Sequence, residues 1–258
     1  MKKNSKELQK LLNDIQFGDL RTPVMDLANK AKPENWSYLD LRRGKPLQAL
    51  WTYLASSYEM SHKKHALSYS AEYKSCLWNT GLVDTSGLEI FGVLHRARKR
   101  THLWKWKQWC TADDNKVIKH FPKLPKNAHK RFLIDQPPYD LTRPVVCNLS
   151  HIANDNVQRL PEALRDMSIT NREGVLTSAI EHHVERVQRG EGAPVPQYYA
   201  GEVGYFLKVS FKPYFQGQTV LALQDTGMKY IAATCLYPQW AYARARVVGV
   251  PPADWITV

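Results

Sequence analysis

The chain has 258 residues, with 36 Lys and Arg against 24 Asp and Glu, and therefore a formal net charge of +12. Hydrophobic residues make up 43% of it, which allows a large core and argues against global disorder. No apolar run reaches the roughly 18 residues of a membrane span, and no secretory signal is visible. We expect a cytoplasmic protein whose four cysteines, which form no close pair, are free thiols.

The first part of the chain has helical patterns. Ser5 can cap a helix whose apolar residues recur at helical spacing. We expect residues 1–17 to form an N-terminal helical arm that docks on the body of the protein or on a protein partner. A short helix is expected around Met25–Ala31, and a longer one over roughly residues 46–60.

The middle of the chain favours β-structure. Residues 66–73 alternate between apolar and polar, and residues 88–94 form an apolar β-rich run. Between them, the segment Asn79-Thr80-Gly81 is interpreted as a three-residue hairpin loop in which Asn79 caps the turn. The prolines between residues 113 and 140 predict an irregular connection with at most one short helix.

The last part repeats this order of helix before strands. Helical spacing covers Arg172–Arg189, and a final helix can begin at Pro238. Between these helices lie three β-like runs, Gly204–Phe211, Thr219–Leu223 and Tyr230–Cys235. The sequence therefore predicts an α+β fold, with one domain over residues 18–258 and a mainly antiparallel sheet flanked by helices.

Most of the net charge lies in one segment. Residues 94–131 contain twelve Lys and Arg and two Asp, a net charge of +10. Residues 101–110 within it alternate, so an ideal strand places Trp104 and Trp106 on one face and Trp109 with the lysines on the other. A single platform of all three tryptophans would need a bulge or a bend.

Cations and indoles in one element are typical of single-stranded nucleic-acid binding, because Lys and Arg attract phosphates and indoles stack on unpaired bases. We expect a nucleic-acid-binding protein, for RNA or single-stranded DNA. Neutralising about six phosphates would weaken duplex binding roughly a thousandfold between 50 and 200 mM salt. The residues expected to make the contacts are Arg96, Arg98, Lys99, Arg100, Trp104, Lys105, Trp106 and Lys107.

The alternative is an enzyme that acts on nucleotides or RNA, such as a nuclease of a toxin or defence type. No motif of high catalytic specificity is present, no metal site is expected, and the sequence assigns no cofactor. The candidate catalytic residues are His151, Asp155, Tyr198 and His183. A polar and aromatic pocket for such an enzyme would use Asn79, Gln197, Tyr198, Tyr199, Tyr242 and Arg246. A third reading is a protein-interaction module that binds a partner through the N-terminal helix.

Each catalytic candidate also has a structural interpretation. His183 lies on the apolar seam of its helix, which favours a hydrogen-bonded core histidine. Asp155 can cap a helix or form an ion pair with Arg159, instead of binding a metal or phosphate beside His151. The segment Pro196–Tyr199 is either a pocket wall or a proline-stiffened loop that covers a sheet edge. Near the C-terminus, Arg244 and Arg246 can hold a phosphate, or Arg244 can pack on Trp240.

Several of these segments occur in an order that resembles one bacterial family, domain of unknown function 3825, over roughly residues 20–258. The matching segments are PENWSY, LWNTGLVD, EIFGVL, FPKLPKNA, NLSHIANDNVQRLP, AIEHHVERV, VPQYYAGEVGYFLKVSF and AYARARVV followed by DWI. The resemblance implies an RNA-related role by analogy, because some relatives accompany cold-shock-type nucleic-acid-binding modules. The family pattern has Asn where this chain has Ala243 or Arg244, and residues 1–17 lie outside it.

Overall fold

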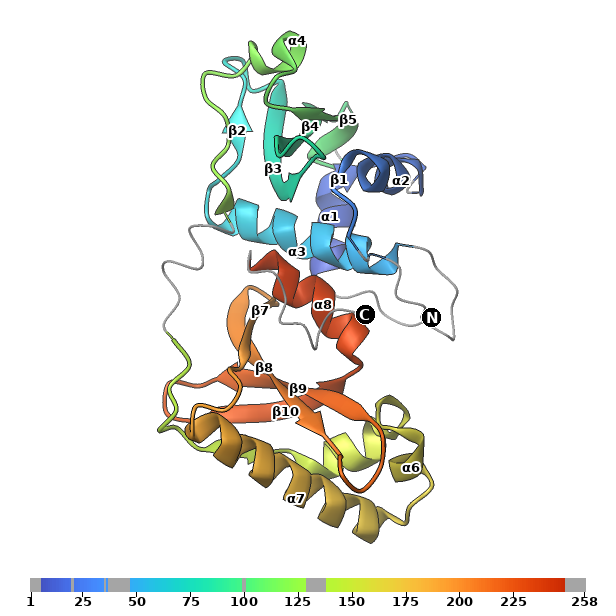
Figure 1. The fold of residues 1–258 in the computed structure, drawn as a ribbon. Coiled ribbons are helices and arrows are strands. Elements are labelled where there is room, and N and C mark those ends of the chain that lie inside the picture. The colour runs from blue at the N-terminus through green and yellow to red at the C-terminus, as the bar shows by residue number, and fades with distance from the viewer. Residues whose placement is uncertain are drawn as a thin grey trace. The chain divides into compact units, whose positions relative to one another are not determined.

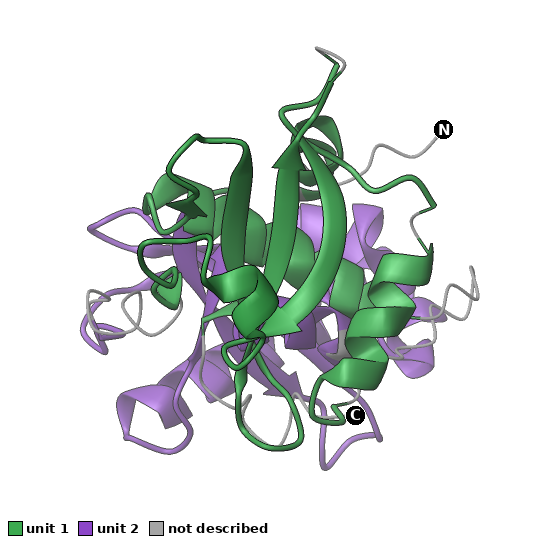
Figure 2. Ribbon diagram, turned by 90° about the horizontal axis from the view of Figure 1, so that it is seen from above, with its two compact units in different colours: residues 1–135, 199–201, 247–249 green, residues 136–198, 202–246, 250–258 purple. Residues whose placement is uncertain are grey.

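The computed structural model describes residues 6–19, 21–34, 36, 47–98, 101–128 and 138–248. The chain divides into two compact units, which Figures 1 and 2 show. Unit 1 comprises residues 1–135, 199–201 and 247–249, and unit 2 comprises residues 136–198, 202–246 and 250–258. Each unit has its own five-stranded sheet.

Unit 1 has the sheet order β1-β5-β4-β3-β2. Its strands are β1 (Ile15–Gln16), β2 (Ser68–Tyr69), β3 (Ser75–Val83), β4 (Glu89–Arg96) and β5 (Trp104–Thr111). Strands β2 to β5 pair antiparallel, whereas β1 pairs parallel with β5. The helices are α1 (Lys6–Asp14), α2 (Arg21–Lys30), α3 (Gln48–Lys63) and the short α4 (Asn115–Ile118).

The N-terminal helix is part of unit 1. Helix α1 packs against α3, and its Leu11 is completely buried. The following Ile15 is also buried and belongs to β1, which extends the sheet at β5. The prediction of a helix here is confirmed. A protein partner for this helix stays a prediction.

The two faces of the unit 1 sheet have different covers. On one face, the ring of Trp78 in β3 contacts that of Tyr58 in α3, with ring centroids 5.4 Å apart. On the other face, Phe91 and Val93 of β4 pack with Phe121 from the segment that follows β5. Phe121 therefore covers the half of this face that contains Cys110 and the C-terminal end of β5.

The β3–β4 hairpin differs from the prediction. Residues 79–81 lie inside β3, where Gly81 has φ +79° and the pairing with β4 shifts register. The turn lies at Asp84–Leu88, where Asp84 Oδ1 accepts hydrogen bonds from the backbone N–H groups of Ser86 and Leu88. The predicted hairpin loop was wrong, because the positive φ of Gly81 forms a bulge and not a turn. Asn79 does cap this bulge, since its Oδ1 accepts from the Gly81 N–H at 2.9 Å.

Unit 2 has the sheet order β6-β10-β9-β8-β7. Its strands are β6 (Val145–Cys147), β7 (Val195–Tyr199), β8 (Glu202–Ser210), β9 (Gln218–Asp225) and β10 (Tyr230–Leu236). Its helices are the π-helix η1 (His151–Asp155), the 3-10 helix η2 (Val157–Arg159), α6 (Glu162–Arg165), α7 (Ile169–Gln188) and α8 (Pro238–Val247). Strand β6 pairs parallel with β10, and β9 pairs antiparallel with both β8 and β10.

Helix α7 lies along one face of the unit 2 sheet (Figure 1). Its N-cap is Ser168, whose hydroxyl accepts from the Asn171 N–H at 3.3 Å, and Gly190 at φ +81° follows its end. Leu176 and Ile180 point from the helix into a core that also contains Leu207 and Leu221 of the sheet. The apolar spacing predicted this helix over Arg172–Arg189, and the cap at Ser168 starts it three residues earlier.

The predicted α+β class and the mainly antiparallel pairing are confirmed. The sequence predicted one sheet, and the described residues form two. Residues 196–199 were expected in a loop and form part of β7, an edge strand where Pro196 is tolerated. All four cysteines are free thiols, as predicted. Among the described helices, none is both long and apolar enough to cross a membrane.

Candidate functional site

Strand β5 contains a β-bulge at Lys107. Val93 of β4 pairs with Gln108, but the next residue, Leu94, pairs with Trp106, so Lys107 is an extra residue. An extra residue reverses the alternation of side chains beyond it. Trp109 therefore shares a face with Trp106, and their ring centroids are 5.8 Å apart.

The bulge gathers the tryptophans but does not expose them. Trp109 is 8% exposed, contacts the ring of Trp78 and donates from Nε1 to the Pro23 carbonyl at 2.6 Å. Trp104 is only 4% exposed. Neither ring has a free face for a base, which corrects the stacking role predicted for Trp104. Trp106 is half-buried.

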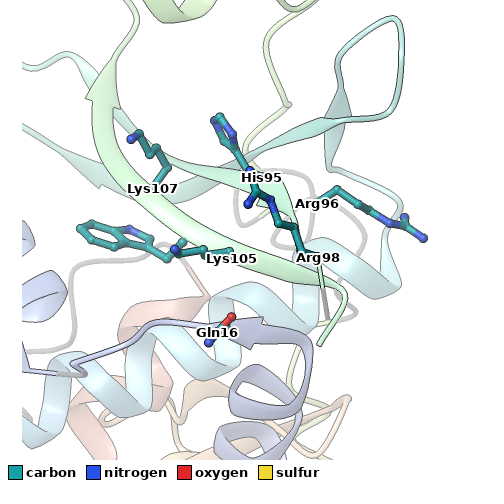
Figure 3. Close-up of a pocket in the computed structure, with 7 residues that line it drawn as sticks. Gln16, His95, Arg96, Arg98, Lys105 and Lys107 are labelled. Carbon is teal, nitrogen blue, oxygen red and sulfur yellow. The ribbon is translucent and has the colours of Figure 1, made fainter. Parts of the chain in front are cut away.

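A depression with a volume of about 780 Å³, here called the basic depression, lies beside the cationic strand β5 (Figure 3). Strand pairing explains it, because Gln16 pairs with Lys105, and Lys105 pairs with His95, in one row across three strands. This row lies on the face that carries Val93, beyond the part that Phe121 covers. The residues that line the depression are Gln16, His95, Arg96, Arg98, Lys105, Trp106 and Lys107.

The depression is strongly cationic. Its four Lys and Arg side chains are exposed, and no Asp or Glu of the described chain lines it. Burial, followed by the charge of Lys107, lowers the pKa of His95, so this ring is neutral at neutral pH. The four cations repel one another because the described lining contains no counter-charge. The site is therefore suited to an anion.

The structure brings most of the predicted nucleic-acid residues together. Arg96, Arg98, Lys105, Trp106 and Lys107 all line the depression. Lys99 and Arg100 lie outside the described residues.

Sequence reasoning missed two exposed aromatic residues at the β2 edge of the same sheet, which reach Trp104 of β5 through their side chains. Tyr69 of β2 and Tyr73, in the turn before β3, have ring centroids 5.5 Å apart. Tyr69 also lies 6.0 Å from Trp104, and the guanidinium of Arg96 lies 5.7 Å from the Trp104 ring. The sequence did contain a pair of tyrosines four residues apart in a β-rich segment. The face of the sheet on which they lie depends on the pairing of β2 with β3, which the sequence does not show.

His183 is a half-buried histidine whose two ring nitrogens are both hydrogen-bonded. Its Nδ1 donates to the Ala179 carbonyl at 2.8 Å, and its Nε2 accepts from the Ser210 N–H at 3.2 Å. Only a neutral ring with the proton on Nδ1 satisfies both bonds. This arrangement supports the structural interpretation and leaves neither nitrogen for catalysis.

We expect stability to depend on pH through His183. Burial is the main cause that lowers its pKa, so the folded protein favours the neutral ring, whereas the unfolded chain binds a proton near pH 6.5. This contribution to stability is complete above the unfolded pKa of about 6.5 and is lost as pH falls from there through the lower pKa of the folded state. Urea unfolding between pH 5 and 8 should show a steeper acid loss for the wild type than for His183→Gln. The exposed neighbour variant His182→Gln should retain the wild-type profile, and equal slopes for all three proteins would contradict the assignment.

His151 and Asp155 form a pair on the surface of η1. His151 Nδ1 lies 2.7 Å from Asp155 Oδ2, and both side chains are partly exposed. The predicted helical ion pair of Asp155 with Arg159 is wrong, because Arg159 donates to Thr234 Oγ1 and the Cys235 carbonyl. π-helical turns occur often at functional sites. A His–Asp pair can act as a general base, so this part of the enzymatic reading stays a prediction.

The residues of the predicted polar pocket are distributed over both units. Asn79 is fully buried in β3 and serves the bulge described above. In β7, Gln197 and Tyr198 are buried, whereas Tyr199 is exposed and is grouped with unit 1. In α8, Tyr242 is buried and Arg246 is partly exposed. Assembly of these six residues into one pocket stays a prediction.

No cluster of metal-ligating side chains is present among the described residues. Across the part of the chain that the structure describes, no three His, Cys, Asp or Glu side chains gather closely enough to hold an ion.

Near the C-terminus, the ring of Trp240 is covered by the guanidinium of Arg159, whose carbon lies 5.6 Å from the ring centroid.

These features define an α+β protein with two antiparallel-rich sheets and a cationic depression on the first. Residues 27–255 match the family described as domain of unknown function (DUF3825), and the chain belongs to this family. The resemblance predicted from the ordered segments is thereby confirmed. No curated protein and no solved structure matches the chain.

Proposed function

We propose that this protein binds nucleic acid, as RNA or single-stranded DNA, through the basic depression. The observation that carries the proposal is the row Gln16, Lys105 and His95, with Arg98 and Lys107 beside it and no carboxylate in the lining. Repeated cations without counter-charges suit a ligand with repeated negative charges. A polyanion with several phosphates fits this arrangement better than a single small anion does.

Salt dependence tests the proposal. Four described cations that neutralise four phosphates of a single strand predict a log–log slope of about −2.8, so affinity falls about fiftyfold from 50 to 200 mM salt. The double variant Lys105→Ala/Lys107→Ala should reduce the slope by about 1.4 and weaken binding at 50 mM salt on the order of fiftyfold. Fluorescence anisotropy with a labelled oligonucleotide measures both quantities.

The matched control is Lys212→Ala/Lys229→Ala, which removes the same charge from exposed positions of unit 2. This control should bind like the wild type. Equal losses for both double variants would show that overall charge, and not the depression, causes binding, and no binding at 50 mM salt would end the proposal. The same samples test the enzymatic alternative, because shortening of the RNA that depends on His151 would identify a nuclease.

A further inference from the structure

An aromatic column, formed by Tyr73, Tyr69 and Trp104, runs from the surface into unit 1. Successive ring centroids are 5.5 and 6.0 Å apart, and both pairs of planes are inclined by 33°. Exposure decreases along the column, from 66% at Tyr73 to 37% at Tyr69 and 4% at Trp104. Only the Tyr73 end is open to a ligand.

The backbone holds Tyr73 in an unusual conformation. Its φ is +53°, a region that bulky residues rarely adopt. The Tyr73 N–H donates to the Ser70 carbonyl at 2.9 Å, and the Ser75 N–H donates to Ser70 Oγ at 3.1 Å. These bonds fix the turn that presents an apolar ring to solvent. Conformations of this kind cluster at functional sites.

Arg96 connects the column to the basic depression. The guanidinium of Arg96 lies over Trp104, and Arg96 also lines the depression. The nearest acidic side chain in the turn, Glu72, is neutralised by an ion pair with Lys74. A strand of nucleic acid that continues from the depression past Arg96 to this turn would therefore meet an exposed aromatic ring and no unpaired carboxylate.

We propose that the exposed face of Tyr73 is a stacking site for one unpaired base of a single strand whose phosphates occupy the basic depression. This inference rests on the proposed function and specifies its ligand. Bases in a duplex have both faces covered by neighbouring pairs, whereas a single strand can place one base on the column. Stacking does not depend on base identity, so the site favours single strands without reading their sequence.

The test separates stacking from charge. Tyr73→Asn removes the ring and retains a residue that tolerates positive φ, whereas Tyr73→Phe retains the ring. The probes are a labelled oligothymidylate and an abasic strand with the same number of phosphates. Tyr73→Asn should bind oligothymidylate about tenfold or more weakly, with unchanged affinity for the abasic strand and unchanged salt slope. Tyr73→Phe should bind both probes like the wild type.

The matched control is Tyr214→Asn, which removes a tyrosine that is 86% exposed in unit 2. It should leave both affinities unchanged. Wild-type affinity of Tyr73→Asn for oligothymidylate, with Lys105→Ala/Lys107→Ala still weakened, would overturn the stacking site and leave the proposed function intact. Equal weakening of Tyr73→Asn on both probes would also overturn it, and no binding of either probe to the wild type would remove both proposals.

Discussion

Replacing Arg172 with methionine is expected to lower the free energy of unfolding by at least about 3 kcal/mol. Arg172 in α7 is 8% exposed and donates four hydrogen bonds to backbone carbonyls. These carbonyls belong to Leu164 (2.8 Å), Ala153 (3.0 Å), Arg165 (2.9 Å) and Met167 (2.8 Å). Methionine fills similar space but donates nothing, and each buried acceptor left without a donor costs about 1–3 kcal/mol.

The matched control for Arg172 is Arg189→Met at the end of the same helix. Arg189 is exposed and pairs with Glu185 and Glu191, and such surface pairs contribute about 1 kcal/mol or less. Urea unfolding followed by circular dichroism should therefore separate the two variants clearly. A loss for Arg172→Met no larger than that for Arg189→Met would show that the four bonds are not needed. The result also bears on η1, because Ala153 lies between His151 and Asp155.

Trp109→Ala is expected to destabilise the protein by about 3–5 kcal/mol, as is usual for removal of a buried indole. Trp109 fills the space between Trp78 and Trp106 and donates to the Pro23 carbonyl of α2. The ring packs directly on Gly92 of β4, where a Cβ would lie 2.9 Å from it, so this neighbour has no side chain that could fill the space left by the indole.

The comparison for Trp109 is Lys107→Ala, two residues earlier on the same strand. Lys107 is exposed, so its loss should change the free energy of unfolding by no more than about 0.5 kcal/mol. The two variants should thus have opposite profiles, with Trp109→Ala affecting stability and Lys107→Ala affecting oligonucleotide binding. Unchanged stability for Trp109→Ala would contradict the packing described for this face.

The longer helices were predictable because their signals are local, whereas the short helices η1, η2 and α6 were not predicted individually. Helix α7 has a Ser cap, an apolar seam and a terminal glycine, and α8 begins at Pro238. The short strands were not, since β1 and β6 have two and three residues and depend on parallel partners far away in the chain. The hairpin was misplaced because Asn-Thr-Gly is common in turns, and only the pairing of β3 with β4 shows that it forms a bulge.

The cationic half of the candidate site was predictable from charge alone, but the aromatic half was not. The bulge at Lys107 depends on the register of β5 with β4, and the sequence of β5 alone does not indicate it. From the sequence alone, Arg172 would be taken for an exposed helix residue. Its burial depends on the carbonyl groups of η1 and α6, which only the folded structure places around it. The neutral state of His183 likewise requires the Ser210 N–H from a different strand.

The bulge in β5 places the packed indoles of Trp106 and Trp109 on one face of the strand and the exposed lysines apart from them. The indoles are fixed by packing, so substitutions at these positions lower the free energy of unfolding. Lys105 and Lys107 are exposed, so their charge can change while the fold persists. Substitutions that remove or reverse the charge of the depression are therefore expected to leave the fold of this chain intact, so its surface charge and its architecture can change independently of each other.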